Sequence, residues 1–254
     1  MAVINRQGVE ISYETRGQGP AILLTHGYSA TGNMWAGQLD ALSASHTVIA
    51  WDMRGHGLSD SPADDALYSE ALTVDDMAAI LDHLGFDSAI VGGLSLGGYM
   101  SLAFHATYPE RVKGLLIIDC GPGYKKDAPR AAWNKTAYQR AADIERLGAE
   151  ALSGGSAERA SATHKDIRGL AFAARNMLTQ HNDRVISSLP DIRVPTLVVA
   201  GANDEPFLVA TEYMARKIPG ATKLIIADAG HAVNMDQPAA FNTGVQAFLA
   251  EHSL

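Results

Sequence analysis

Cysteine is almost absent from this sequence, whose 254 residues include only one, Cys120. A single thiol cannot form a disulfide within the chain, and no paired Cys/His spacing typical of a structural zinc site is present. No stretch approaches the roughly 18 consecutive apolar residues that a membrane-spanning helix needs. The first residues also lack the charged and then apolar layout of a signal peptide. We therefore expect a globular, cytoplasmic protein with no membrane partner.

Basic residues are in the minority, with 20 Lys and Arg against 28 Asp and Glu and a net charge of −8. This balance disfavours a protein that binds along nucleic-acid phosphates. The nucleotide motif GxxxxGK(S/T), the zinc motif HExxH and a GxGxxG that opens a helix after a strand are all absent. We therefore expect no cofactor, no metal and no nucleic-acid partner.

Short apolar runs alternate with helical patterns along most of the chain, which is typical of a parallel sheet covered by helices on both faces. The strands predicted from these runs are Val9–Thr15, Ala21–Thr25, Val48–Trp51, Ala89–Val91, Gly114–Asp119, Thr196–Ala200 and Lys223–Ala227. The predicted helices are Thr73–Leu84, Leu96–Tyr108, Phe207–Lys217 and Pro238–Glu251, the last with Asp236 as its N-cap. The sequence therefore predicts an α/β fold.

The alternation stops between residues 121 and 189, a segment that is Ala-rich, helical in pattern and without a strand signal. We call residues 121–189 the cap and expect a helical insertion over the sheet's edge, with a break between two helices at Ser153–Ser156. Residues 1–120 and 190–254 are expected to form the core domain. The cap holds eleven Lys and Arg against seven Asp and Glu, so it carries +4 while the remainder carries −12.

A glycine-rich turn joins the predicted strand Ala89–Val91 to the helix that follows it. Residues Gly93–Gly97 read GLSLG, which is G-x-S-x-G between a strand and a helix. The small residues allow the strained turn that raises a serine hydroxyl above the sheet, and the helix N-terminus favours developing negative charge. Ser95 is therefore the candidate nucleophile.

A serine nucleophile needs a histidine base, and the histidine needs a carboxylate that orients it. The chain supplies both residue types directly after two later predicted strands, in Gly201–Asp204 and in Asp228–His231. Both segments lie past the carboxyl end of a parallel strand, which is the sheet edge where ligands bind in open α/β folds. Asp119, which ends the predicted strand before the cap, is an alternative to Asp204 as the acid.

The order Ser95, Asp204, His231 resembles that of the α/β-hydrolase superfamily, and the likeness extends over nearly the whole chain outside the cap. Further segments are similar to family landmarks: Thr25–Tyr28 (THGY) to the His-Gly oxyanion turn, Asp52–Ser59 (DMRGHGLS) to D-x-R-G-x-G-x-S, and His231–Pro238 to H-x5-(D/E)-x-P with one residue fewer. The resemblance implies a mostly parallel eight-stranded sheet flanked by helices, with a helical cap inserted after strand 6.

The same resemblance implies roles for individual residues. Ser95 would be the nucleophile, His231 the general base and later acid, and Asp204 the residue that orients His231 and stabilises its imidazolium form. The backbone N–H groups of Tyr28 and Leu96 would form the oxyanion hole.

An aspartate at position 95 would indicate haloalkane dehalogenase or epoxide hydrolase chemistry. The serine found there argues against both reactions, and acyl transfer to water remains as the expected reaction. The small size and short cap resemble those of carboxylesterases and enol-lactone hydrolases, so we expect a small-molecule ester or lactone substrate cleaved through an acyl-enzyme. One alternative is carbon–carbon cleavage of the meta-cleavage type, whose hydrolases tend to carry Asn where Leu94 stands. Another is a small-molecule receptor of the same fold without turnover. The sequence leaves open whether the protein is a monomer or a homo-oligomer.

The sequence also offers candidates for the walls of the substrate pocket. Trp35, which follows the oxyanion turn, is one, with helix packing as its alternative role. Lys125, Lys126 and Arg130 are others, because a cap of charge +4 above the pocket would steer a carboxylate-bearing substrate toward it. Arg168 and Arg175 are further candidates, and solvation of the outer faces of the cap helices is the alternative role for all these cations.

Overall fold

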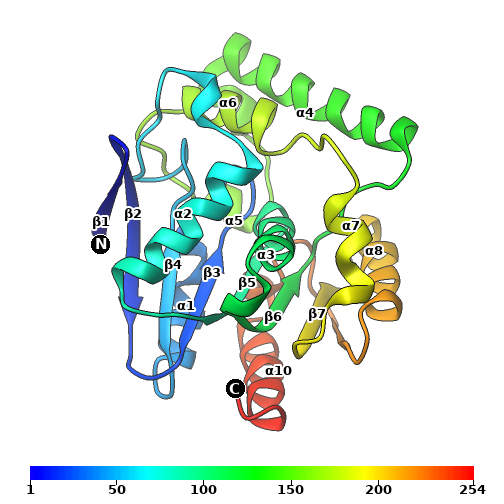
Figure 1. Ribbon diagram of the computed structural model, residues 1–254. Helices are drawn as coiled ribbons and strands as arrows, with labels where there is room; N and C mark the ends of the chain where they lie inside the picture. The colour runs from blue at the N-terminus through cyan, green and yellow to red at the C-terminus, as the bar shows by residue number, and fades with distance from the viewer.

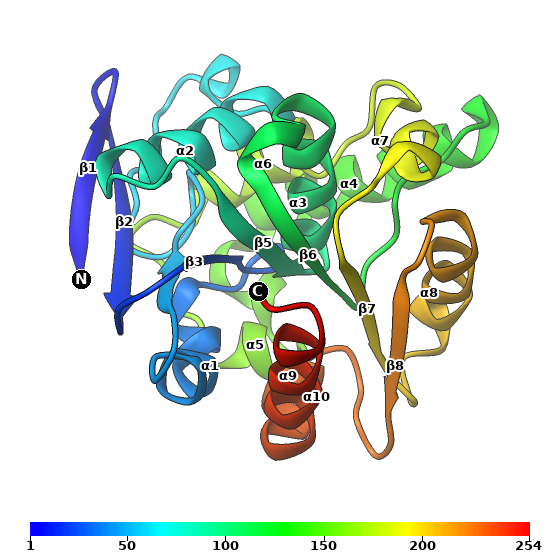
Figure 2. The same cartoon turned by 60° about the horizontal axis from the view of Figure 1, so that its bottom comes forward.

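A computed structural model describes residues 1–254 and places one eight-stranded sheet between layers of helices (Figure 1). The strands are β1 (Ala2–Arg6), β2 (Val9–Arg16), β3 (Ala21–Thr25), β4 (Thr47–Trp51), β5 (Ala89–Leu94), β6 (Val112–Ile118), β7 (Thr196–Gly201) and β8 (Thr222–Ile226). Their order across the sheet is β1-β2-β4-β3-β5-β6-β7-β8. Only the pairs that involve β2 are antiparallel. Figure 2 shows β1 and β8 at opposite edges.

Helices cover both faces of this sheet. Those outside the cap are α1 (Ala36–Leu42), α2 (Glu70–His83), α3 (Leu96–Thr107), α8 (Glu205–Lys217), α9 (Val233–Asp236) and α10 (Pro238–Glu251). Short 3-10 turns are η1 (Gly32–Trp35), η2 (Asp65–Leu67), η3 (Pro109–Arg111) and η5 (Leu189–Asp191). The predicted strands and helices all form, with shifted ends in most of them, whereas the sequence analysis missed β1 and α1. The predicted fold class, a mostly parallel eight-stranded sheet flanked by helices as in α/β-hydrolases, is confirmed. None of the helices has the length and apolar character needed to cross a membrane.

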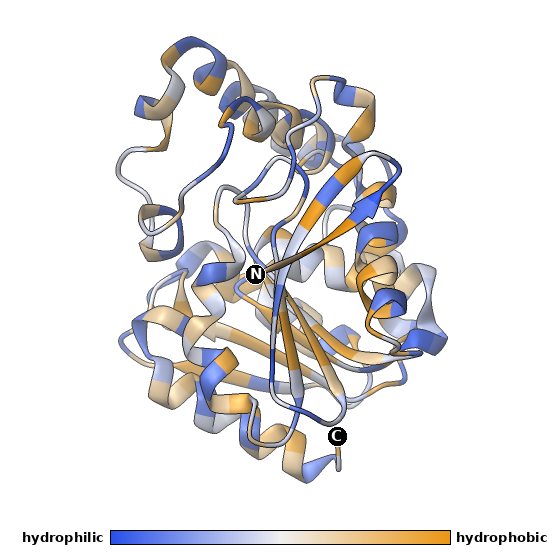
Figure 3. Cartoon of the chain, turned by 90° about the vertical axis from the view of Figure 1, so that its left-hand side faces the viewer, coloured by the Kyte–Doolittle hydropathy of each residue, from blue (hydrophilic) through white to orange (hydrophobic).

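Alternation along the buried strands creates a separate hydrophobic core on each face of the sheet. In β3, Leu23 belongs to one core, whereas Ile22 and Leu24 belong to the other. The first core is completed by side chains of α2, α3 and α8, and the second by side chains of α1 and α10. Because both faces are covered, the central strands are apolar at successive positions, and Figure 3 shows them largely in orange.

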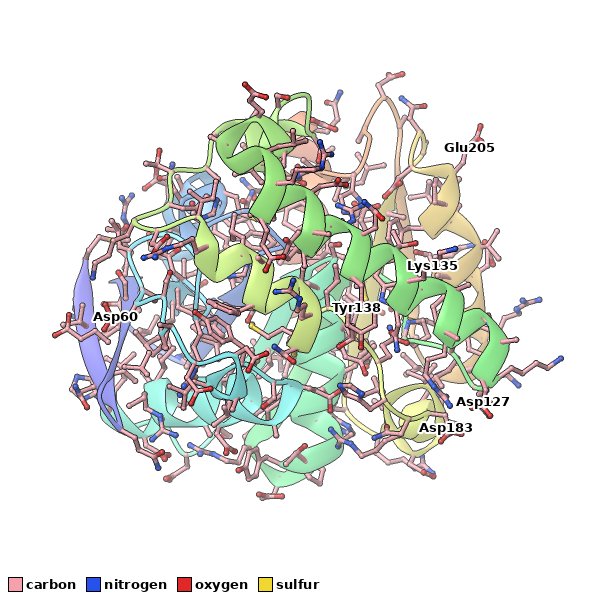
Figure 4. The ribbon with its side chains drawn as sticks, turned by 90° about the horizontal axis from the view of Figure 1, so that it is seen from above. Asp60, Asp127, Lys135, Tyr138, Asp183 and Glu205 are labelled. Atoms are coloured by element: carbon pink, nitrogen blue, oxygen red, sulfur yellow. The ribbon has the colours of Figure 1, made fainter.

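The cap segment lies between β6 and β7. It comprises α4 (Asp127–Leu147), η4 (Gly148–Leu152), α5 (Ala157–Ala160), α6 (Arg168–Asn176) and α7 (Arg184–Ser188). The predicted break at Ser153–Ser156 falls between η4 and α5. The helix α4 packs against α6 at the top of the molecule, while α7 packs against α3 (Figure 1). Figure 4 looks down on α4, with Asp127 at one end and Lys135 and Tyr138 farther along it.

A cluster of three histidines fastens the cap to the core. The Nδ1 atom of His164 accepts a hydrogen bond from the N–H of Gly57 at 3.0 Å, and its Nε2–H donates to the carbonyl of Ser29 at 3.2 Å. The ring centroid of His164 lies 6.0 Å from that of His56, which lies 4.9 Å from that of His26. Burial lowers the pKa of all three rings, that of His26 to about 3, so they are neutral at pH 7.

The start of α10 differs from the prediction. Gln237, and not Asp236, is the N-cap residue, and its side chain makes no capping hydrogen bond. Asp236 instead ends α9, and its Oδ2 accepts a hydrogen bond from the N–H of Gly230 at 2.8 Å. Asp236 therefore orients the residue that precedes His231, which accounts for an acid at this position in the shortened H-x4-D-x-P spacing.

Candidate active site

Ser95 lies in a strained turn between β5 and α3. Its backbone angles, φ 56° and ψ −115°, belong to a region that residues with a side chain rarely adopt. The N–H of Ser95 donates to the carbonyl of Ile118 at 2.9 Å, which anchors the turn to β6. The turn also requires glycine at position 97, because a Cβ there would lie 2.1 Å from the carbonyl oxygen of Thr25. The chain thereby holds the partly exposed Ser95 side chain in the wall of a cavity.

His231 and Asp204 meet at the same cavity. The Nδ1–H group of His231 donates to Oδ2 of Asp204 at 2.7 Å. The two residues come from different segments, since Asp204 follows β7 and His231 follows β8. The ring of Phe207 lies against that of His231, with centroids 4.9 Å apart and planes inclined by 33°. Because Nδ1 carries a proton, Nε2 is the nitrogen of His231 that remains able to accept one.

Asp119 lies behind this pair and is fully buried. Its Oδ1 accepts a hydrogen bond from the N–H of Gly201 at 3.0 Å. Burial raises the pKa of Asp119 well above its usual range, and the Gly201 N–H opposes the rise while the charge of Asp204 adds to it, so the site favours the neutral form of Asp119. The potential ligand atoms of Asp119, Asp204 and His231 lie within 4.8 Å of one another, but the hydrogen bond between the last two already uses one ligand atom of each.

Two backbone N–H groups next to the cavity are available to a ligand. The N–H of Leu96, at the first position of α3, has no acceptor within the helix. The N–H of Tyr28, in the turn after β3, takes no part in the hydrogen bonds of the turns and loops. His26 holds this turn, because its Nε2 accepts from the N–H of Met53 at 3.0 Å and its Nδ1–H donates to the carbonyl of Gly27 at 2.7 Å.

The cavity around Ser95 has two lobes, of about 140 Å³ and about 370 Å³. We call the smaller one the apolar lobe and the larger one the charged lobe. Both are lined by Ser95 and by Tyr124, Trp133, Leu178, Pro206 and Phe207. The apolar lobe also contains Leu96, Tyr99, Gly121, Pro122, Gly123, Ala210 and one polar side chain, Gln180. The charged lobe also contains Tyr28, Arg140, Glu158, Arg159, Asp204 and His231.

None of the residues predicted to line the pocket lines either lobe, and these predictions are wrong. Trp35 has 0% exposure and packs in the core beneath α1 and α10. Lys125 is exposed to solvent. Arg130 pairs with Asp127 and donates to the carbonyl of Tyr124 at 3.0 Å, so it supports a wall residue from outside the cavity. The physical reason is that a residue's position along the chain does not fix the direction of its side chain.

The sequence analysis missed the two cap arginines that do line the cavity, Arg140 and Arg159. The helical period of α4 did contain a signal for Arg140. Ala137 and Ile144 belong to the buried stripe of this helix. Arg140 comes seven residues, or about two turns, after Trp133, so the two side chains lie on the same side of the helix. Arg159 follows the loop that contains the predicted break, and no periodicity in the sequence indicates its direction. Arg168 pairs instead with a neighbouring carboxylate and lines neither lobe.

Comparison with known proteins places these features in a family. A family model described as the alpha/beta hydrolase fold matches residues 20–154. The chain belongs to the α/β-hydrolase family. It is 28% identical to 3-oxoadipate enol-lactonase 2 of Acinetobacter baylyi, over 97% of this chain and 95% of the relative.

Solved structures of other hydrolases are similar over nearly the full chain. An esterase from Thermogutta terrifontis, solved with malate bound, has a TM-score of 0.85 at 27% identity and covers 98% of this chain and 97% of its own. The enol-lactonase from Burkholderia xenovorans has a TM-score of 0.78 at 25% identity and covers 98% and 100%. The resemblance seen in the motifs is therefore confirmed, and the protein is a member of a family of hydrolases.

Proposed function

We propose that this α/β-hydrolase cleaves a carboxylic ester or a lactone through an acyl-enzyme on Ser95. The observation that carries the proposal is the 2.7 Å hydrogen bond between His231 and Asp204, in residues that line one lobe of the cavity together with Ser95. A serine hydroxyl is a weak nucleophile at neutral pH, and an oriented histidine is the base that activates it. No other charged residue need take part in the proton transfers.

In the proposed mechanism, Nε2 of His231 takes the proton of the Ser95 hydroxyl as Oγ attacks the substrate carbonyl carbon. Asp204 keeps the proton on Nδ1 and stabilises the imidazolium that forms. The N–H groups of Tyr28 and Leu96 donate to the oxyanion, each contributing about 3–4 kcal/mol to transition-state stabilisation. The N-terminus of α3 adds a favourable dipole at the same point.

Departure of the leaving group completes acylation, and attack by water then completes the reaction. His231 gives its proton to the leaving oxygen, and the bond between this oxygen and the carbonyl carbon breaks. Water then attacks the carbonyl carbon of the ester on Ser95, and His231 takes a proton from the water. His231 next gives this proton to Oγ of Ser95 as the bond between Oγ and the carbonyl carbon breaks, which releases the carboxylic acid and the free serine. The related esterase and enol-lactonases support an ester or lactone, rather than another acyl group, as the substrate.

Hydrolysis of phenyl butanoate and of δ-valerolactone tests the proposal. We expect turnover of at least one of them, and a loss of three or more orders of magnitude in Ser95→Ala, since removal of the nucleophile leaves only the oxyanion donors. Ser101→Ala is the matched control, because Ser101 is a buried serine in α3, the helix that follows Ser95, and its hydroxyl donates to the carbonyl of Gly97 at 2.8 Å.

Covalent labelling gives an independent readout. Phenylmethylsulfonyl fluoride should modify the wild-type protein at Ser95, as located by peptide mass spectrometry, and should not modify Ser95→Ala. Activity of Ser95→Ala within tenfold of wild type, or a label on another residue, would contradict the assignment of the nucleophile.

A further inference from the structure

The cap contains seven arginines, and two of them differ from the rest. Five pair with carboxylates: Arg130 with Asp127, Arg146 with Asp143, Arg168 with Asp166, Arg175 with Glu145, and Arg184 with Glu70. Arg140 and Arg159 form no ion pair, and these two line the charged lobe. A guanidinium without a counter-ion at a cavity wall is suited to bind an anionic group of a ligand.

The two acidic residues of the charged lobe, Glu158 and Asp204, form no ion pair with its two arginines. Glu158 is 2% exposed, its Oε1 accepts from the hydroxyl of Ser156 at 2.5 Å, and its Oε2 is buried without a hydrogen-bond partner. The carboxylate of Asp204 accepts from His231. Neither acid forms an ion pair with an arginine, so both guanidinium groups remain free to pair directly with a ligand.

The two arginines act on the same space. Arg159 is oriented by its Nε–H, which donates to Oγ of Ser29 at 2.9 Å, and its terminal nitrogens make no hydrogen bond with the chain. Burial raises the pKa of Tyr28, and the charges of both arginines oppose this rise at its hydroxyl. Desolvation, and then the like charge of Arg159, lower the pKa of Arg140. An anion bound between the two guanidinium groups would offset their repulsion.

The position of His231 indicates which part of a substrate would meet these arginines. His231 lines the charged lobe and is absent from the apolar lobe. In acyl transfer the histidine gives its proton to the leaving oxygen, so the leaving group lies on the side of the histidine. The leaving group therefore occupies the charged lobe, and the acyl chain occupies the apolar lobe beside Leu96 and Tyr99.

We propose that this hydrolase selects substrates with a carboxylate on the leaving-group side and a short apolar acyl chain, and that Arg140 and Arg159 bind the carboxylate. This inference rests on the proposed function, because it uses the direction of proton transfer from His231. In a lactone the carboxylate would stand on the carbon chain next to the ring oxygen.

Three phenyl esters test the inference. Phenyl butanoate is neutral, 3-(butanoyloxy)benzoate carries a carboxylate on its leaving group, and monophenyl heptanedioate carries one at the end of its acyl chain. Values of kcat/KM are compared across a salt series. Each value is first divided by the rate constant for alkaline hydrolysis of the same ester, so that differences in intrinsic reactivity cancel. We expect wild type to favour 3-(butanoyloxy)benzoate over phenyl butanoate by about tenfold or more at low salt, to lose part of this preference as salt rises, and to disfavour monophenyl heptanedioate.

Substitutions assign the preference to residues. Arg140→Gln and Arg159→Gln should each lower it by about tenfold, mainly through KM, because each removes a charged hydrogen-bond donor from the carboxylate. Arg146→Gln is the matched control, since Arg146 lies on the same helix as Arg140 but pairs with Asp143 at 3.0 Å on the exposed surface. Arg140 is exposed, so its replacement should not unfold the protein.

Direct binding separates this inference from the proposed function. Calorimetric titration of Ser95→Ala should show tighter binding of 3-(butanoyloxy)benzoate than of phenyl butanoate, and Arg140→Gln in that background should remove the difference. Equal wild-type preference for the two esters, or no change in both arginine variants, would overturn the inference while ester hydrolysis stood. A preference for monophenyl heptanedioate would overturn the leaving-group assignment. Binding without hydrolysis of any ester would overturn the proposed function and support the carboxylate site.

Discussion

Asp204→Asn and Asp119→Asn form a matched pair of substitutions. Both replace a buried carboxyl by an amide of the same shape, in side chains that lie next to each other, and only Asp204 contacts His231. If Asp204 orients the histidine, the first substitution should nearly abolish ester hydrolysis and the second should leave most of it.

The magnitude for Asp204→Asn follows from the contact it breaks. An amide nitrogen 2.7 Å from Nδ1 of His231 would force the ring proton onto Nε2, which could then no longer accept the proton of Ser95. The opposite amide orientation keeps the tautomer but loses the negative charge that stabilises the imidazolium. In a well-characterised Ser-His-Asp triad the same replacement lowers kcat by about 10⁴. That loss corresponds to about 5.4 kcal/mol of transition-state stabilisation.

Asp119→Asn should be mild because burial raises the pKa of Asp119 and so favours its neutral form, which an amide resembles. The amide oxygen of Asn can keep accepting the N–H of Gly201, and the amide adds no charge to the buried site. We therefore expect kcat within about tenfold of wild type.

The assay is kcat for phenyl butanoate at pH 7–8, with circular dichroism and urea unfolding to establish that each variant is folded. A folded Asp204→Asn that keeps kcat within tenfold of wild type would refute the role of Asp204. A folded Asp119→Asn that is more damaged than Asp204→Asn would transfer the role to Asp119.

Three further predictions concern stability, measured by urea unfolding. Ser95→Gly should be about 1 kcal/mol more stable than Ser95→Ala, because glycine relieves the φ of 56°; equal stabilities would argue against strain. Trp35→Ala should cost about 3–5 kcal/mol and Trp35→Phe less than about 1.5, since the fully buried ring fills the core and its N–H has no partner to lose; similar costs would contradict this packing. The lowered pKa values of His26, His56 and His164 mean that, as pH falls, the unfolded chain binds protons before the folded chain does. The free energy of unfolding should therefore be full above about pH 6.5 and fall as pH drops toward 3, by up to about 1.4 kcal/mol per pH unit for each ring. A free energy of unfolding that stays constant from pH 7 to 5 would contradict this prediction.

The sequence by itself determined the features that depend on local pattern. Apolar runs bounded by turns located the buried strands, and β3 (Ala21–Thr25) begins and ends where it was predicted. The turn around Ser95 was predictable because only small residues fit there, as the clash at Gly97 explains. Likewise, Pro238 at the first position fixed the start of α10.

Only the tertiary structure decided which side chains meet. Asp119 and Asp204 are the same residue type, and both follow the carboxyl ends of strands at the same edge of the sheet. The loop after β7 brings Asp204, and not Asp119, into hydrogen-bond contact with His231. Arg130 and Arg140 lie on one helix and carry the same charge, yet one pairs with Asp127 on the outside and the other lines the charged lobe. The physical reason is that local sequence fixes backbone conformation through short-range sterics and periodicity, whereas the direction of a side chain relative to distant segments depends on how the helices pack.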